Sequence, residues 1–211
     1  MKFVVGGCLS ALALAVVGAP VSHADTAPVC TETGNSYTAG WQSDWAAYEA
    51  AEQNPADTRS RQTVDLPITI AAPFEKVWTV YSNLRNDLGR HPFMKDMINH
   101  RTCTDADSET IDFTALDNIP VGPFSYPALT QAEQRIYPAE HYYLSDSWDQ
   151  PGVTTHQKIT FTDNGDGTTT VNEHITFVAN PLLIAFTVDN GSSSHREYQA
   201  ALKRDIENGT L

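Results

Sequence analysis

One stretch, Val64 to Trp78, restricts the possible folds of this chain more than any other. From 64 to 70 apolar residues alternate with polar ones, a period of two that is typical of a strand with one buried face. The pattern changes at Ala72-Pro73, where proline suits the start of a helix because its missing N–H would have no partner there. Apolar residues then recur at helical spacing. The sequence therefore predicts a strand that leads directly into a helix.

The first 24 residues have the pattern of a signal peptide. Lys2 precedes an apolar run from Phe3 to Val17, and small residues stand at the two positions that a signal peptidase reads before Asp25. The run is shorter than the roughly 20 residues that a membrane-spanning helix needs. We therefore expect a secreted, extracellular protein that has no stably inserted membrane segment.

The rest of the chain is long enough for one domain with a sizeable core. We expect a leader at 1–24, an N-terminal extension with one amphipathic helix at 25–62, and a single folded domain at 63–208. The formal net charge is −13, and the sequence contains no basic cluster. Because phosphates and anionic headgroups would be repelled, the composition argues against nucleic acid and against an anionic membrane surface as partners.

Removal of the leader would leave two cysteines, Cys30 and Cys103, since Cys8 lies within it. Two cysteines in an exported chain most often pair. A bond that closes a loop of about 70 residues would stabilise the fold by about 4 kcal/mol if chain entropy dominates. We expect this disulfide to fasten the extension to the domain, with two free thiols as the alternative.

The extension contains one helical pattern, from Ala39 to Gln53, which ends at Asn54-Pro55. Its large aromatic residues are four and three positions apart, so they share one face of the helix. Such a stripe packs the extension onto the domain or, as the alternative, binds a protein partner. The stripe consists of Trp41, Trp45 and Tyr48.

After the first helix the pattern predicts a second short helix or turn at 83–96 and then a series of strands. The expected strands are 97–104, 109–116, 128–136, 140–148, 153–162 and 168–179. Residues 118–127 contain three prolines and a glycine, which predicts a loop. The last two strands flank a dense run of turn formers at 163–167.

The end of the chain predicts a long helix. Ser194 to Glu197 has the form of a capping box that would open this helix. The apolar stretch 182–188 is either a first helical segment or a buried approach, interrupted at Asn190-Gly191. Counting 64–70, seven strands and one long helix predict an α+β helix-grip fold, in which a curved antiparallel sheet wraps the helix and leaves a cavity between them.

The chain resembles the SRPBCC or START-like superfamily, which includes polyketide cyclase-like proteins. The segment Ile68 to Trp78, with its Ala-Pro helix start and Val-Trp pair, is similar to the family's opening strand and helix. The 163–168 turn and the terminal helix are also similar, so the resemblance covers 63–208. It implies a deep apolar cavity that in relatives holds lipids, sterols or polyketides, sometimes with chemistry. The motif builds the strand–helix junction, so no catalytic residue carries over.

The candidate site residues are those expected on the concave face of the sheet. On the last hairpin the odd-numbered positions point inward, and pairing Thr162 with Thr168 would set Gln157 directly opposite Glu173. A carboxyl group in an apolar cavity can serve as an acid or base, so Glu173 is the candidate catalytic residue. The candidate ligand-binding residues are Gln157, Glu173, Phe113, Tyr142, Phe161, Phe177, Phe93 and His91.

The remaining groups of polar residues do not indicate a cofactor or a metal site, and we expect neither. The same register would place His156 opposite His174 on the outer surface, as a solvated pair. The turn at 163–167 superficially resembles a calcium loop, but Gly165 stands at its third ligand position. The sequence contains no phosphate-cradling glycine loop, no zinc-protease motif and no serine-hydrolase elbow.

These observations predict an exported protein that binds an apolar or amphipathic small molecule, such as a lipid, sterol or polyketide-like compound, between the sheet and the terminal helix. Two alternatives stay open. One is a cyclase- or aromatase-type enzyme that uses Glu173 as acid or base. The other is an extracellular interaction protein whose cavity is filled by its own side chains. Binding without catalysis is the expectation.

Overall fold

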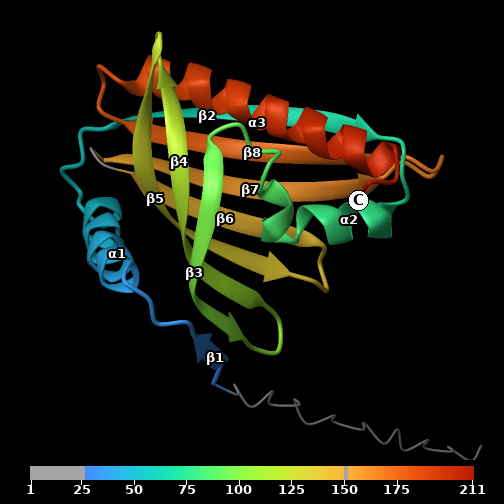
Figure 1. The fold of residues 1–211 in the computed structure, drawn as a ribbon, viewed down its shortest axis with the longest axis horizontal. Coiled ribbons are helices and arrows are strands. Elements are labelled where there is room, and N and C mark those ends of the chain that lie inside the picture. Colours follow the sequence, from blue (N-terminus) through green and yellow to red (C-terminus); the bar gives the residue numbers. More distant parts are fainter. Residues whose placement is uncertain (1–26, 150–151) are drawn as a thin grey trace, which may run out of the picture.

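The computed structural model describes residues 27–149 and 152–211, so the expected signal peptide lies outside the described residues. One antiparallel sheet curves around a long C-terminal helix (Figure 1). In chain order the elements are β1 (Val29–Glu32), α1 (Thr38–Glu52), β2 (Ser60–Ile70), α2 (Phe74–Tyr81), the short 3-10 helix η1 (Leu84–Asp87), β3 (Met94–Thr104), β4 (Glu109–Val121), β5 (Phe124–Tyr137), β6 (Tyr142–Asp149), β7 (Val153–Asp163), β8 (Thr169–Ala179) and α3 (Ile184–Glu207).

The strands follow the order β1-β3-β4-β5-β6-β7-β8-β2, so the first long strand pairs with the last one. This α+β helix-grip arrangement confirms the predicted fold class, with β1 as an eighth strand that the sequence did not indicate. In the part of the chain that the structure describes, none of the helices is long and apolar enough to cross a membrane.

The predicted strand–helix junction forms as expected. Leu66 and Ile70 on β2 are buried, and α2 begins at Phe74, directly after Pro73. Trp78 and Tyr81 on α2 pack in the same buried cluster as Leu202 and Ile206 of α3. The short turn at Ala72-Pro73 therefore places β2 and α2 against the same core, and α3 packs on that core as well.

The predicted loop at 118–127 is instead the tip of a long hairpin. β4 and β5 pair without a break from Asn118↔Pro127 to Val121↔Phe124, and Gly122 takes a positive φ in the turn. Prolines are tolerated because neighbouring strands stop earlier, so each hairpin strand has an unpaired edge there. The proline count was thus a sign of edge strands rather than of a loop.

The expected capping box at Ser194 is also wrong, because α3 runs continuously from Ile184 to Glu207. Within this helix the Ser194 hydroxyl donates to the carbonyl oxygen of Gly191 at 2.8 Å. Gly191 lies against the ring of Phe177 on β8, with no space for a Cβ atom. The Asn190-Gly191 pair therefore allows helix and sheet to approach closely and does not end the helix.

The N-terminal extension adds β1 to one edge of the sheet and packs α1 on part of its outer face. A disulfide joins Cys30 of β1 to Cys103 of β3, which are paired across the two strands. On α1 the indole of Trp41 stacks on Trp45 at 5.5 Å, and both rings contact Trp148 of β6. The aromatic stripe thus packs the extension onto the domain, as the first of the two interpretations predicted.

Candidate functional site

A cavity with two connected chambers lies between the concave face of the sheet and α3. The outer chamber has a volume of about 610 Å³ and is lined by the β4–β5 hairpin, β6, β7 and the first half of α3. The inner chamber has a volume of about 120 Å³ and lies deeper, towards η1 and Tyr198. The two chambers share the walls formed by His91, Asp117, Thr130, Ser147, Gln157 and His195.

Glu173 of β8 points into the inner chamber and is 1% exposed. One of its oxygens, Oε2, lies 2.9 Å from Nδ1 of His195 on α3. The other, Oε1, is buried without a hydrogen-bond partner among the described residues. A carboxyl group removed from water in this way can accept a proton or hydrogen bond from a ligand that reaches it.

The partner expected for Glu173 was Gln157, and that pairing is wrong. In the structure Glu173 lies opposite Ile159, and Gln157 lies opposite Ile175. The hairpin closes at Asp163↔Thr169, two residues farther along β8 than expected. A shift of two keeps the same side chains on the inner face, so both residues still line the inner chamber.

A second buried pair stands beside the first. The hydroxyl of Tyr198 on α3 donates to Oδ1 of Asp87 at 2.6 Å. Burial raises the pKa of Asp87 to about 7, although the Tyr198 hydrogen bond acts in the opposite direction. Burial also raises the pKa of Tyr198 well above its usual value. At neutral pH the Asp87 carboxyl group is therefore partly protonated and can donate as well as accept.

His91, from the segment after η1, lies between these two pairs. Its ring is 5.6 Å from that of His195 and 5.8 Å from that of Tyr198. Burial, reinforced by His195, lowers the pKa of His91 to about 3, so the ring is neutral at pH 7. Nδ1 of His91 is buried without a partner in the described parts of the chain. It is therefore a free donor or acceptor at the junction of the chambers.

Two further acidic groups line the outer chamber, and one of them, Asp117, also lines the inner one. Burial raises the pKa of Asp149 to about 7 and raises that of Asp117 above its usual range. The hydroxyl of Thr130 donates to Oδ2 of Asp117 at 2.5 Å. These groups form a polar belt in a chamber that is otherwise mostly apolar, with Ile119, Phe177 and Phe186 among its walls.

Six of the eight predicted ligand-binding residues line this cavity. Phe93 and Phe177 line the outer chamber and Phe113 and Glu173 the inner one, whereas His91 and Gln157 line both.

Phe161 and Tyr142 lie elsewhere. Phe161 is part of the closed core, edge-on to Trp78 at 5.3 Å. Tyr142 is on the outer face, where it stacks on Tyr137 at 4.6 Å and lies under Nζ of Lys158. Its neighbour Tyr143 is the residue that points inward. A one-residue error in strand parity explains the difference.

The outer-face histidines do not meet. His174 lies opposite Lys158 instead of His156 and bonds Asp65 through Nδ1 at 3.0 Å. His156 bonds Asp146 at 2.8 Å. Over residues 27–149 and 152–211 no group of three or more His, Cys, Asp or Glu side chains could hold a metal ion.

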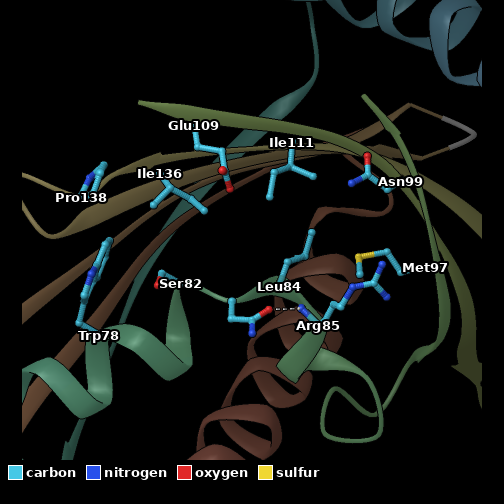
Figure 2. Close-up of a pocket in the computed structure, with 11 residues that line it drawn as sticks. Trp78, Ser82, Leu84, Arg85, Met97, Asn99, Glu109, Ile111, Ile136 and Pro138 are labelled. Atoms are coloured by element: carbon cyan, nitrogen blue, oxygen red, sulfur yellow. Dashed lines mark hydrogen bonds between the residues drawn. The ribbon is translucent and has the colours of Figure 1, made fainter. Parts of the chain in front are cut away.

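Figure 2 shows another cavity, of about 430 Å³, between the helical segment α2–η1 and strands β3 to β5. Leu84 of η1 lines both this cavity and the inner chamber and so forms part of the wall between them. Ile111 and Ile136 face it from the sheet. Among the described residues, the cavity of Figure 2 is lined by one with a buried, unpartnered polar atom, the amide oxygen of Asn99. We place the candidate site in the two-chamber cavity because its unpartnered polar atoms include those of titratable side chains, His91 and Glu173.

Neither a family model nor a curated protein sequence matches this chain. Solved structures do match. The Zhui aromatase/cyclase from Streptomyces sp. R1128 superposes with a TM-score of 0.59 at 12% identity, over 72% of this chain and 97% of that one. A START superfamily protein from Mycobacterium smegmatis gives 0.51 at 15% identity, over 69% and 97%. A protein from Thermus thermophilus gives 0.55 at 13% identity, over 71% and 100%.

The chain therefore has the SRPBCC/START-like, polyketide cyclase-like fold. At these identities the likeness concerns the fold, and the site must be argued from its own residues. Sequence reasoning missed His195, Asp87 and Tyr198, which come from α3 and η1. His195 and Tyr198 belong to the terminal helix and Asp87 to a short polar segment, and nothing local in the sequence connected any of them to Glu173.

Proposed function

We propose that this protein binds an apolar or amphipathic small molecule, such as a lipid, sterol or polyketide-like compound, in the two-chamber cavity. The observation that carries the proposal is the division of the cavity into a large, mostly apolar outer chamber and a small polar inner one. Their volumes of about 610 and 120 Å³ together fall within the range of small-molecule sites.

The inner chamber specifies the polar end of the ligand. Oε1 of Glu173 is a buried acceptor and Nδ1 of His91 a buried donor or acceptor, and neither has a partner in the described chain. Oε1 of Gln134 is a third such atom. Because an unpaired buried polar atom costs about 1–3 kcal/mol, a ligand that supplies hydroxyl or carbonyl groups at this end recovers that free energy. The preferred ligand has one oxygenated end and an apolar body.

Export and secretion are part of the proposal. The Cys30–Cys103 disulfide supports them, because such bonds persist in oxidising compartments and are rare in the cytosol. In the same way we propose 63–208 as the ligand-binding domain and 25–62 as an extension that packs on part of its outer face.

Catalysis is the second candidate function, and the Glu173–His195 pair favours it. When the Nδ1–H group of His195 donates a hydrogen bond to Oε2 of Glu173, the other nitrogen of the neutral ring, Nε2, keeps a free lone pair. A base of this kind at the polar end of an apolar cavity can take a proton from a carbon beside a carbonyl group. In this candidate reaction His195 is the base and Glu173 orients its ring. The sequence alone had indicated Glu173 itself as the acid or base.

Displacement of an environment-sensitive apolar dye tests the proposed function. The wild-type protein should bind the dye at the cavity, and long-chain fatty acids or sterols should displace it. Ala128→Trp adds a bulky ring to the wall of the outer chamber and should weaken dye binding at least tenfold. Ala139→Trp is the matched control, since Ala139 is exposed in the turn between β5 and β6. Equal dye binding by both variants would contradict a ligand site in this cavity.

A further inference from the structure

Exposed apolar side chains gather around the mouth of the outer chamber. Phe124 and Tyr126 at the tip of the β4–β5 hairpin are 75% and 59% exposed, and Leu182 and Phe186 at the start of α3 are 92% and 43% exposed. Tyr126 and Phe186 also line the outer chamber. Figure 1 shows the hairpin tip extending past the N-terminal end of α3. We call these four residues the mouth surface.

The hairpin tip extends beyond the strands that support it. The last partner of β3 on β4 is Asp117, and β6 pairs with β5 only from Gln131 onward. Beyond these points the two hairpin strands pair with each other, and in the described chain only Asn118 still donates a backbone hydrogen bond to a neighbour, the carbonyl oxygen of Phe93. Single exposed apolar residues are normal on a protein surface, but a group of large ones at a cavity opening marks an interaction site.

The charge distribution indicates what this surface contacts. Residues 118–132 and 175–188, which supply both sides of the mouth, contain no charged residue, although the chain carries a net charge of −13. An anionic bilayer would repel the acidic body of the protein. A zwitterionic bilayer would not, and its interfacial layer favours aromatic and aliphatic side chains such as those of the mouth surface.

We propose that the mouth surface docks reversibly on a zwitterionic lipid bilayer. This inference rests on the proposed function, because docking places the opening of the outer chamber against the lipid phase. An apolar ligand then passes between bilayer and cavity without crossing water. Phe124 and Leu182 are the anchors, and Tyr126 and Phe186 connect the docked surface to the chamber wall. Asp189, the next charged residue on α3, limits the depth to which that helix enters the headgroups.

Flotation with phosphatidylcholine vesicles tests the proposal. The full-length mature protein should float with the vesicles, and replacing part of the lipid with phosphatidylglycerol should reduce the bound fraction. The double variant Phe124→Ser, Leu182→Ser should bind vesicles at least about tenfold more weakly, since binding scales with buried apolar area. The control is Val29→Ser. Val29 has the same 75% exposure as Phe124 but lies on β1, at the opposite end of the β3–β4 pair. This control should bind vesicles like wild type.

Several outcomes would overturn the inference. Wild-type protein that stays in solution, or a double variant that floats as well as the Val29→Ser control, excludes this surface as a bilayer contact. A wild-type dimer in sedimentation velocity that the double variant abolishes, without flotation, would show that the surface binds a second copy of the chain.

Dye binding without vesicles separates this inference from the proposed function. Phe124 and Leu182 lie outside the chamber walls, so the double variant should keep wild-type dye affinity. Dye binding without flotation overturns the docking alone. Flotation without dye binding supports the docking surface and contradicts the ligand cavity.

Discussion

Gly191→Ala tests how closely α3 packs on the sheet above the cavity. A Cβ atom at position 191 would lie 2.7 Å from Cζ of Phe177 and nearer still to Cε1. Phe177 is almost fully buried, so its ring can yield only towards the outer chamber that it lines. Alanine gains about 1 kcal/mol over glycine in helix propensity. Overpacking a filled core costs about 1–3 kcal/mol. We therefore expect the free energy of unfolding to fall by about 1 kcal/mol, the middle of the resulting range.

Urea unfolding measures this change, and α1 offers a matched control. Gly40 is also helical, but a Cβ atom there would meet no atom within 4 Å. Gly40→Ala should therefore raise the free energy of unfolding by up to about 1 kcal/mol. In a Phe177→Leu background, which removes the ring edge, Gly191→Ala should cost less than in wild type. If Gly191→Ala stabilises as much as Gly40→Ala, α3 does not lie against Phe177, and the wall that these two residues form in the cavity is incorrectly placed.

Three further predictions concern the inner chamber and the disulfide. Glu173→Ala removes the buried acceptor of His195 and should cost about 2–3 kcal/mol in urea unfolding, whereas Glu173→Gln should cost less because its amide oxygen still accepts; equal costs would argue against the pair. Burial raises the folded-state pKa of Asp87 to about 7, so the native state binds a proton at this carboxyl group more tightly than the unfolded chain does. The stability that this protonation contributes is therefore lost as pH rises from about 4 to 7. Asp87→Asn should therefore gain stability relative to wild type across that range in melts at pH 4.5 and 7.5, by at most about 1.4 kcal/mol per pH unit, and a constant difference would refute the assignment. Cys30 and Cys103 should resist alkylation until a reductant is added, as intact-mass measurement would show; full alkylation without reductant would contradict the disulfide.

The sequence predicted the elements whose signals are local. The alternation before Ala72-Pro73 and the helical spacing after it fixed the β2–α2 junction, and the period of two placed Gln157 and Glu173 on the inner face. The extra strand β1 was missed because it pairs with β3, which is distant in sequence. The hairpin at 118–127 pairs locally, but its prolines indicated a loop, and the unpaired strand edges that tolerate them depend on where β3 and β6 end.

The candidate site could not be predicted fully from the sequence for a different reason, which is that its residues meet only in the tertiary structure. Glu173 was identified from its own strand, but its partner His195 comes from a helix whose position depends on the fit of Gly191 to Phe177. The register of the last hairpin could not be read from a turn with several adjacent turn formers, and an error of two residues preserved the inward face while changing the opposing residue. For Tyr142 an error of one residue was enough to exchange inside for outside.

The central claim is that the cavity between the sheet and α3 holds an apolar or amphipathic ligand. Native mass spectrometry of the protein purified from the organism that makes it tests this claim most directly. We predict one additional mass at a ratio of one per chain, which organic extraction removes and which Ala128→Trp lacks while Ala139→Trp retains it. A wild-type protein that carries no additional mass and binds no apolar dye would contradict the claim.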